Sequence, residues 1–414
     1  MIAIALTAAC AARAETPGSA RADSAIGARA DSAIGVRADS AIGVRADSAT
    51  GARVVDYLWV VRTALLRPDD IERVIERARE MGVHGLLAQV VGRGDAFYRS
   101  DLLPRSEALG AARDTDASFD PLAELVERAH RAGLEVHAWM NCLLVWSAPQ
   151  PPRDPRHVVN SHPEWLARTR DGRKLSQLTA HRRERLGIEG VYLAPANAGV
   201  RTFLARIAAE IASRYAVDGI QLDYIRQPGI DVGYDPGTRS RFALATGVDP
   251  MRMDPVPAAE RTPIDSAWSE FQRAQVTATV REIRDSLAAV RPGLTLSAAV
   301  LADTALARER HAQAWTEWVR DGLIDRAFVM CYAAPVQTVM EQLVAYAKAF
   351  GLGGRVVPGI AVYNTEASMA AAKILGAREL GFPLLALYSY DALEEHSGYW
   401  FSLRGSMAAA AARP

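Results

Sequence analysis

The stretch Asp218-Gly-Ile-Gln-Leu-Asp-Tyr-Ile225 follows a helix predicted over residues 198–215 and precedes a second helix predicted over 265–290. It is short and mostly apolar, which is typical of a parallel strand covered on both faces. The same unit of strand and helix recurs along the chain after Val54. The eight predicted strands are residues 56–62, 85–91, 134–140, 218–225, 294–300, 326–332, 355–360 and 384–390.

Eight such units in about 350 residues predict an α/β protein with a closed (β/α)8 TIM barrel. The alternative is an open, doubly wound sheet, but no Gly-rich phosphate-binding turn follows any predicted strand. Pro68 at the start of the first helix and Gly82 at its end suit the two ends of that helix. We assign residues 54–405 to the barrel and residues 406–414 to an Ala-rich tail.

The residues before the barrel have a different character. Residues 1–20 resemble a secretory leader, because an apolar start runs into Ala-Arg-Ala at 12–14, and Leu6-Thr-Ala-Ala-Cys10 resembles a lipoprotein box. Residues 21–53 repeat Arg-Ala-Asp-Ser-Ala-Ile-Gly followed by Ala or Val, which predicts a disordered, flexible spacer. We therefore expect an exported protein, periplasmic, anchored to the outer membrane or extracellular, with lipidated Cys10 as a membrane tether. A plain apolar tail is the alternative.

Composition limits the classes of partner. The 414 residues include 48 basic and 48 acidic side chains, so the net charge is zero and nothing indicates nucleic-acid binding. Three cysteines, Cys10, Cys142 and Cys331, cannot build a disulfide framework, and the last two are predicted to be small buried residues. No pair of histidines has the spacing of a metal site, so we predict neither a metal nor a cofactor. The oligomeric state stays open.

The ends of the predicted strands carry carboxylates, guanidinium groups and aromatic rings. Active sites of TIM barrels form at these ends, and these residue types bind sugars by hydrogen bonds and by stacking on ring faces. We therefore expect a glycan partner. The residues at or just after the strand ends are Arg62, Arg93, Asp95, Tyr98, Trp139, Asn141, Asp223, Tyr224, Arg226, Asp303, Tyr332, Tyr363, Tyr388, Tyr390 and Asp391.

Five strings along the chain resemble the glycosyl-hydrolase-like 10 family in the same order. They are residues 89–100, Phe119-Asp-Pro-Leu122, Glu135-Val-His-Ala-Trp-Met-Asn141, His162-Pro-Glu-Trp165 and residues 218–226. The resemblance covers residues 55–400 and implies an exported bacterial glycoside hydrolase on a TIM barrel, of a family in which some members act on peptidoglycan glycan strands. The chain departs from the family pattern at Gln227, where an aromatic residue is usual, and at Tyr224, where some members carry a second Asp.

Glycoside hydrolysis needs two carboxylates, and Asp223 is the strongest candidate for one of them, as nucleophile or base. The alternative is a buried Asp with a structural hydrogen bond. The second carboxylate would act as the acid. Asp303, at the end of the neighbouring strand, is preferred for it, with Asp95 and Asp391 as rivals.

The remaining strand-end residues are predicted to bind substrate. Arg62, Arg93 and Arg226 would hold sugar hydroxyls or orient Asp223, although structural ion pairs are equally compatible with the sequence. The other predicted contacts are Tyr98, Trp139, Asn141, Tyr224, Tyr332 and Tyr390, although strand-end aromatic residues often pack in a core. The sequence thus predicts a glycoside hydrolase that cleaves a polysaccharide or peptidoglycan glycan strand. A non-catalytic carbohydrate-binding barrel is the alternative, and a xylanase-type site is excluded because strands four and seven lack a terminal Glu.

Overall fold

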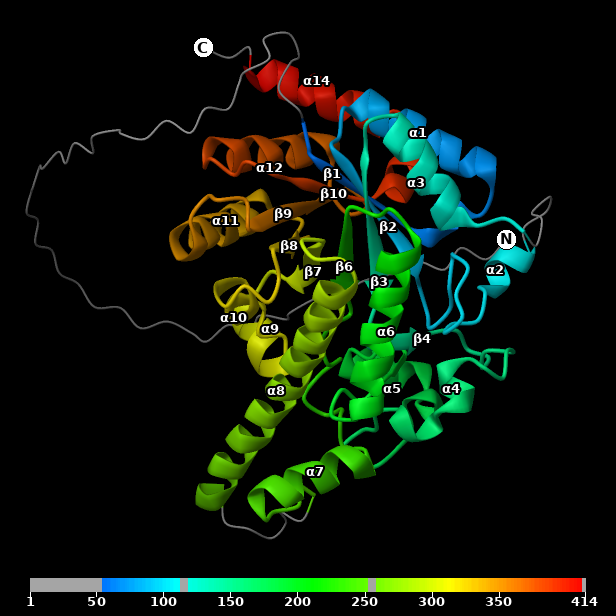
Figure 1. Ribbon diagram of the computed structural model, residues 1–414. Coiled ribbons are helices and arrows are strands. Elements are labelled where there is room, and N and C mark those ends of the chain that lie inside the picture. Colours follow the sequence, from blue (N-terminus) through cyan, green and yellow to red (C-terminus); the bar gives the residue numbers. More distant parts are fainter. Residues whose placement is uncertain (1–53, 112–117, 252–257, 412–414) are drawn as a thin grey trace, which may run out of the picture. The chain divides into compact units, whose positions relative to one another are not determined.

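Eight parallel strands close into a barrel in the computed structural model, which describes residues 54–111, 118–251 and 258–411 (Figure 1). The predicted TIM barrel is confirmed, and each strand overlaps one of the eight predicted strands. The strands are β1 (Tyr57–Val60), β2 (Gly85–Val91), β3 (Glu135–Asn141), β6 (Gly219–Asp223), β7 (Thr295–Leu301), β8 (Arg326–Cys331), β9 (Val356–Ala361) and β10 (Ala386–Tyr388). The predictions for residues 1–53, including Cys10, fall outside the described residues and stay predictions.

Helices surround the barrel. The longer ones are α1 (Pro68–Met81), α3 (Pro121–Arg131), α6 (Ala198–Arg214), α7 (Pro236–Thr246), α8 (Ala258–Val290), α11 (Val336–Phe350), α12 (Ala367–Glu379) and α14 (Tyr399–Ala411). Shorter ones are α2 (Glu107–Ala111), α4 (Val158–Ser161), α5 (Ala180–Leu186), α9 (Thr304–His311), α10 (Trp315–Arg320) and α13 (Tyr390–Glu395). Helix α1 begins with Pro68 in its first turn and ends at Gly82 with φ of 66°, as predicted. Helix α14 packs on α12 and continues to Ala411, through most of the Ala-rich segment.

One predicted helix is wrong in its bounds. The sequence indicates a helix over 311–321, whereas the chain forms α9 up to His311 and then a separate α10 from Trp315. Ala312 takes a left-handed conformation with φ of 53°, which ends α9 and breaks the helical path. The sequence did not predict helix α9, whose first turn is capped by the side chain of Asp303.

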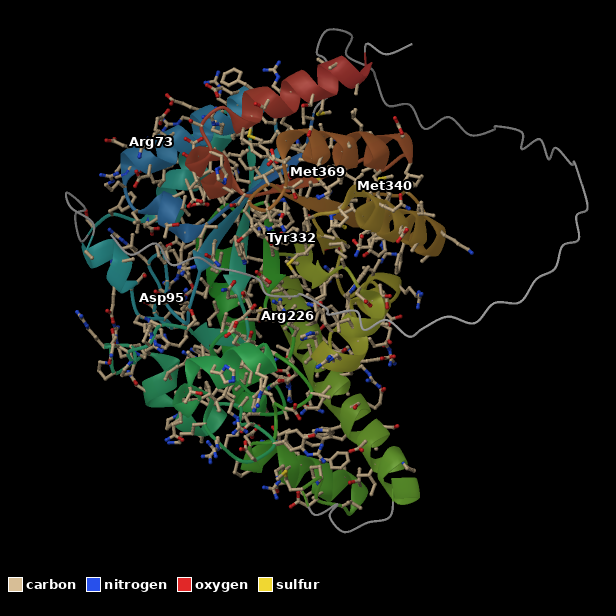
Figure 2. All side chains as sticks on the ribbon, turned by 180° about the vertical axis from the view of Figure 1, so that it is seen from behind. Arg73, Asp95, Arg226, Tyr332, Met340 and Met369 are labelled. Carbon is tan, nitrogen blue, oxygen red and sulfur yellow. The ribbon has the colours of Figure 1, made fainter. Side chains whose placement is uncertain are left out.

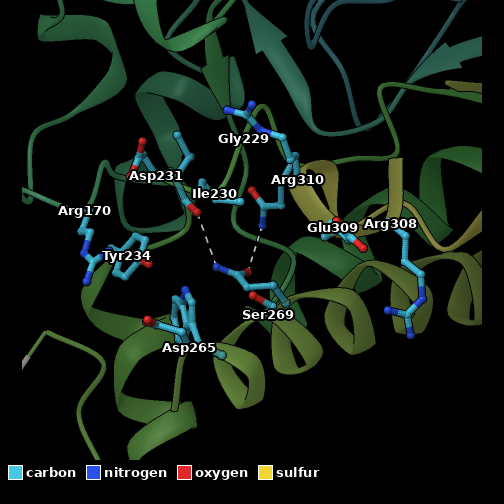
Figure 3. Close-up of a pocket in the computed structure, with 15 residues that line it drawn as sticks. Arg170, Gly229, Ile230, Asp231, Tyr234, Asp265, Ser269, Arg308, Glu309 and Arg310 are labelled. Carbon is cyan, nitrogen blue, oxygen red and sulfur yellow. Dashed lines mark hydrogen bonds between the residues drawn. The ribbon is translucent and has the colours of Figure 1, made fainter. Parts of the chain in front are cut away.

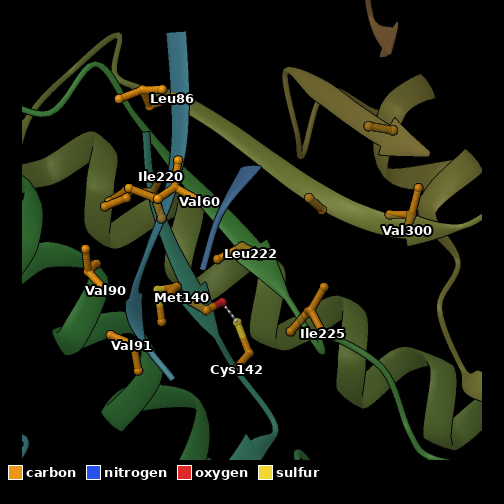
Figure 4. Packing of buried hydrophobic residues seen from close by; sticks show 14 of the residues in the cluster. Val60, Leu86, Val90, Val91, Met140, Cys142, Ile220, Leu222, Ile225 and Val300 are labelled. Atoms are coloured by element: carbon orange, nitrogen blue, oxygen red, sulfur yellow. Dashed lines mark hydrogen bonds between the residues drawn. The ribbon is translucent and has the colours of Figure 1, made fainter. Parts of the chain in front are cut away.

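The strands bury both of their faces. Outward side chains such as Leu86, Ile220 and Leu222 are fully buried in one large cluster between the barrel and its helices (Figure 4). A second cluster is formed by side chains on the other face of the strands and includes Tyr57, Trp59, Leu87, Trp139 and Phe328. This double burial explains why the strands are apolar runs without alternation. Cys142 and Cys331 are buried free thiols, as predicted.

Gly219 makes a tight contact inside the barrel, where it pairs with His137 of β3. A Cβ atom at this position would collide with Nδ1 of His137 and lie 2.9 Å from the carbonyl oxygen of Thr295. We expect Gly219→Ala to lower the free energy of unfolding by about 1–3 kcal/mol, because a packed interior cannot relax around the added methyl group. Urea unfolding followed by circular dichroism measures the effect. Gly405→Ala is the control: this helical site in α14 has no atom within 4 Å of the added Cβ, and Ala should leave stability unchanged or raise it.

The segment between β3 and β6 lies across the carboxyl ends of the strands (Figure 1). It contains a small antiparallel sheet of β4 (Leu144–Trp146) and β5 (Val191–Tyr192). Backbone hydrogen bonds join it to the end of β6: the N–H of Cys142 donates to the carbonyl of Asp223 at 2.8 Å, and the N–H of Leu143 donates to that of Tyr224 at 3.1 Å. The N–H of Leu193 in turn donates to the carbonyl of Leu143 at 2.8 Å. The residues around β5 are thereby held beside the end of β6.

Candidate active site

Asp223 is the last residue of β6 and lies in the barrel mouth with 7% of its surface exposed. Its Oδ1 accepts hydrogen bonds from the backbone N–H of Tyr224 at 2.6 Å and from Nη1 of Arg226 at 3.4 Å. Burial raises the pKa of Asp223, and the charge of Arg226 and the Tyr224 N–H oppose that rise without cancelling it. A carboxyl group that keeps its proton above the usual range can act as an acid.

Tyr224 has φ of 48°, in the left-handed region. Such a conformation costs a non-Gly residue about 1–3 kcal/mol and is concentrated at functional sites. The centroid of its ring lies 4.3 Å from the guanidinium carbon of Arg226, which is itself buried and pairs with Asp223 at 3.4 Å. Burial lowers the pKa of Arg226, but the negative charges of Glu189 and Asp223 outweigh this effect, so the pKa is raised overall.

Three tyrosines form a wall of the site. Tyr332, Tyr363 and Tyr388 follow or end the neighbouring strands β8, β9 and β10. The rings of Tyr332 and Tyr388 stack with centroids 5.2 Å apart, and Tyr363 meets both edge-on. Burial raises the pKa values of Tyr332 and Tyr388, and the charge of Asp223 adds to the rise of both. Tyr332 is among the predicted contacts, whereas Tyr363 and Tyr388 are noted at strand ends without being assigned to the substrate.

A hydrogen-bonded network lines the side of the mouth formed by β1, β2 and β3. Arg62 donates to Gln89 at 2.7 Å, and Gln89 donates to Oδ1 of Asn141 at 3.2 Å. Trp139 also donates to that oxygen at 3.0 Å, while the amide nitrogen of Asn141 donates to the carbonyl of Gly92 at 2.7 Å. Asn141 is the register partner of Asp223, and its amide both accepts and donates hydrogen bonds in this network. It therefore positions the strand ends, while the charge of Arg62 partly opposes the rise in the pKa of Tyr388.

Arg93 and Asp95 belong to the loop after β2. Oδ1 of Asp95 accepts the backbone N–H of Arg93 at 2.9 Å, which shapes the loop. Burial and the nearby charge of Arg62 lower the pKa of Arg93. Figure 2 shows Asp95 apart from Arg226 and Tyr332.

The structure does not bring the other predicted residues together with Asp223. Asp303 is exposed and caps α9 through a 2.9 Å hydrogen bond from the N–H of Leu306. Tyr98 is buried, and its hydroxyl donates to Glu210 of α6 at 3.0 Å. Burial and the charge of Glu394 raise the pKa of Tyr390 to about 12, and Glu394 itself pairs with Arg77 of α1 at 2.8 Å.

Asp391 is also engaged. It accepts the backbone N–H of Val61 at 3.0 Å and the hydroxyl of Thr63 at 3.3 Å. These bonds tie the segment after β10 to the segment after β1, and burial raises the pKa of Asp391. The Asp391 carboxylate thus links the first strand, β1, to the last, β10, where the barrel closes.

Glu189 is a carboxylate of the site that the sequence reasoning missed. Its Oε2 accepts the hydroxyl of Tyr192 at 3.0 Å, and the rings of Tyr192 and Tyr224 lie 6.4 Å apart. Glu189 is exposed to solvent, and its charge raises the pKa of Asp223. No strand-end rule could find it, because it precedes β5 in the segment between β3 and β6.

A pocket of about 230 Å³ opens beyond Arg226 (Figure 3). Gln227 lines it together with Tyr234 and Trp268, and Arg170 lies over the Tyr234 ring at 5.8 Å. Its rim carries charges of both signs, including Asp231, Asp265, Glu309 and Arg310. It is lined by residues of the loop 227–234, of α8 and of the chain around α9, and Asp223 is not among the residues that line it.

Within 54–111, 118–251 and 258–411, no three His, Cys, Asp or Glu side chains gather as a metal ion would require. No helix there has the length and apolar character needed to cross a membrane.

A closed parallel barrel with an acidic and aromatic mouth defines a TIM barrel of the glycoside hydrolase-like class. Residues 53–351 match the glycosyl hydrolase-like 10 family, and the chain belongs to that family. The chain is 27% identical over 168 residues to glycosyl hydrolase DigH of Escherichia coli (strain K12), covering 37% of this chain and 34% of DigH. It is 26% identical over 153 residues to glycosyl hydrolase YngK of Bacillus subtilis (strain 168), covering 36% of this chain and 26% of YngK. The matches thus span about a third and a quarter of these relatives.

Solved structures share the fold. The PgaB (BpsB) glycoside hydrolase domain from Bordetella bronchiseptica superposes with a TM-score of 0.63 at 16% identity, covering 85% of this chain and 98% of that domain. A β-galactosidase from Bacillus circulans sp. alkalophilus superposes with a TM-score of 0.57 at 12% identity, covering 86% of this chain and 55% of the enzyme. At these identities the likeness concerns the barrel alone.

Proposed function

We propose that the protein hydrolyses O-glycosidic bonds of a polysaccharide or of the glycan strands of peptidoglycan. The observation that carries this proposal is the buried carboxyl group of Asp223, with a raised pKa, at the mouth of a barrel of this family. Such a group can protonate the oxygen of the scissile bond, so we propose Asp223 as the acid, in place of the role of nucleophile or base that the sequence indicated. The names of DigH and YngK support the reaction class.

The walls of the site suit a sugar chain. The stacked rings of Tyr332 and Tyr388 offer apolar faces beside Asp223, while Arg62 offers a donor for hydroxyl groups on the other side. The pocket lined by Gln227 and Trp268 gives room for a neighbouring sugar unit. The mixed charge of its rim agrees with a neutral or weakly charged glycan.

One observation favours the alternative, a carbohydrate-binding barrel without turnover. Arg226 lies 3.4 Å from Asp223 and stabilises the ionised form of the carboxyl group. An acid catalyst, in contrast, must be protonated before it reacts. Catalysis therefore requires that burial raise the pKa of Asp223 by more than the ion pair with Arg226 lowers it.

The two functions are separated by comparing turnover with binding. The full chain is incubated with denuded peptidoglycan and with common plant and bacterial polysaccharides, and new reducing ends and co-sedimentation are measured in parallel. We expect new reducing ends from at least one glycan. Co-sedimentation with a glycan that is never cleaved would instead support the binding barrel.

A further inference from the structure

A hydrolase with Asp223 as the acid needs a second carboxylate near the anomeric carbon. The three aspartates that the sequence suggests are engaged elsewhere: Asp303 caps α9, Asp95 shapes the loop after β2, and Asp391 joins the segments after β1 and β10. The position after Asp223 is occupied by Tyr224 rather than by an acid. Glu189 is a further carboxylate, and its charge reaches Asp223.

Glu189 is held on the Asp223 side of the mouth by backbone and side-chain contacts. The hydrogen bonds from Leu143 to Tyr224 and from Leu193 to Leu143 place the chain around β5 next to the end of β6. The buried hydroxyl of Tyr192 then donates to Oε2 of Glu189 at 3.0 Å. Its carboxylate is thus fixed by a rigid neighbour although it is exposed to solvent.

The charge of Glu189 reaches Asp223. The charge of Glu189 raises the pKa of Asp223 and, together with Asp223, raises that of Arg226. One carboxyl group is buried and the other is exposed, so their environments differ as those of an acid and a base do. The exposed partner has access to the water that hydrolysis consumes.

We propose that Glu189 is the catalytic base of this site, a role that rests on the hydrolase function proposed above. The protonated carboxyl group of Asp223 donates its proton to the glycosidic oxygen, which leaves with the electron pair of the broken bond. A water oxygen forms the new bond to the anomeric carbon, and the carboxylate of Glu189 takes the proton that this water loses. Asp223 ends ionised and Glu189 ends protonated, and exchange with solvent resets both. This single displacement inverts the anomeric centre.

The test uses the full chain and a glycan that the wild type cleaves. Glu189→Gln keeps the shape and the hydrogen bond of the side chain but cannot take a proton, so kcat should fall about 100-fold with glycan binding retained. Glu184→Gln is the matched control, because Glu184 is an exposed carboxylate five residues earlier, in α5, and this variant should retain the wild-type rate. NMR of the first product should show inversion.

A rescue experiment separates a base from a merely structural residue. Glu189→Ala leaves space in which azide can attack the anomeric carbon, so added azide should restore cleavage and yield a glycosyl azide of inverted configuration. Unchanged activity of Glu189→Gln, or a retained product, would overturn the role of Glu189 while hydrolysis by the wild type still stood. No cleavage by the wild type of any glycan would instead remove the proposed function itself.

Discussion

Asp223→Asn should lower kcat/KM for the cleaved glycan by about 10³-fold, the largest effect on activity that we expect from one substitution. The amide has the same shape and still accepts the N–H of Tyr224, but it cannot deliver a proton to the glycosidic oxygen. Glycan binding should survive, because the tyrosine wall and Arg62 are unchanged. Initial rates of reducing-end release and co-sedimentation measure the two quantities.

The control for this variant is Asp303→Asn. Asp303 also follows a strand, but it is exposed and caps α9, and Asn is an equally good capping residue. The Asp303 variant should therefore keep both the fold and the wild-type rate. If Asp303→Asn abolished cleavage and Asp223→Asn did not, the acid would be Asp303 and the present assignment would be wrong.

The same assignment fixes the sign of the pH dependence. Burial raises the pKa of Asp223, so its proton is held to higher pH than in an exposed Asp. Because the protonated form is the active one, kcat/KM should fall as the pH rises through this pKa. A profile without a fall on the alkaline side would exclude Asp223 as the acid.

The fold could be predicted from the sequence because each barrel strand is a short apolar run closed in by helices. The strand-end rule also placed Asp223, Tyr224, Arg226, Arg62 and Tyr332 correctly at the mouth, since parallel strands end on one side of a barrel. That rule gives the position of a residue but not the direction or partner of its side chain. Asp303 obeys the rule and turns to cap α9, and Tyr98 lies in the right loop but faces α6.

Glu189 shows the other limit. Its place beside Asp223 depends on the pairing of β4 with β5 and on the backbone hydrogen bonds from Leu143 to Tyr224. These contacts join segments distant in the sequence, and a two-residue strand such as β5 has no periodic signal. A site residue contributed by a long connection can therefore be found only once the connection is folded.

The largest expected effect on stability concerns Arg226. It lies buried beside Asp223, with its guanidinium over the Tyr224 ring, and Glu189 adds a second negative charge nearby. Arg226→Met should lower the free energy of unfolding by about 3–5 kcal/mol near neutral pH, because it leaves the ionised Asp223 buried without its counter-ion. Urea unfolding followed by circular dichroism measures the loss.

The loss should depend on pH in a defined direction. Without Arg226 the pKa of Asp223 in the folded state rises further above its unfolded value, so the folded state binds the proton more tightly than the unfolded chain does. The variant should therefore lie closest to the wild type at about pH 4 and fall behind it as the pH rises to about 8. The double variant Asp223→Asn/Arg226→Met removes both charges and should be more stable at about pH 8 than Arg226→Met alone, since no buried anion remains. Equal losses in the single and double variants at every pH would mean that Arg226 stabilises the mouth through packing on Tyr224, and that the pKa of Asp223 is set by burial alone.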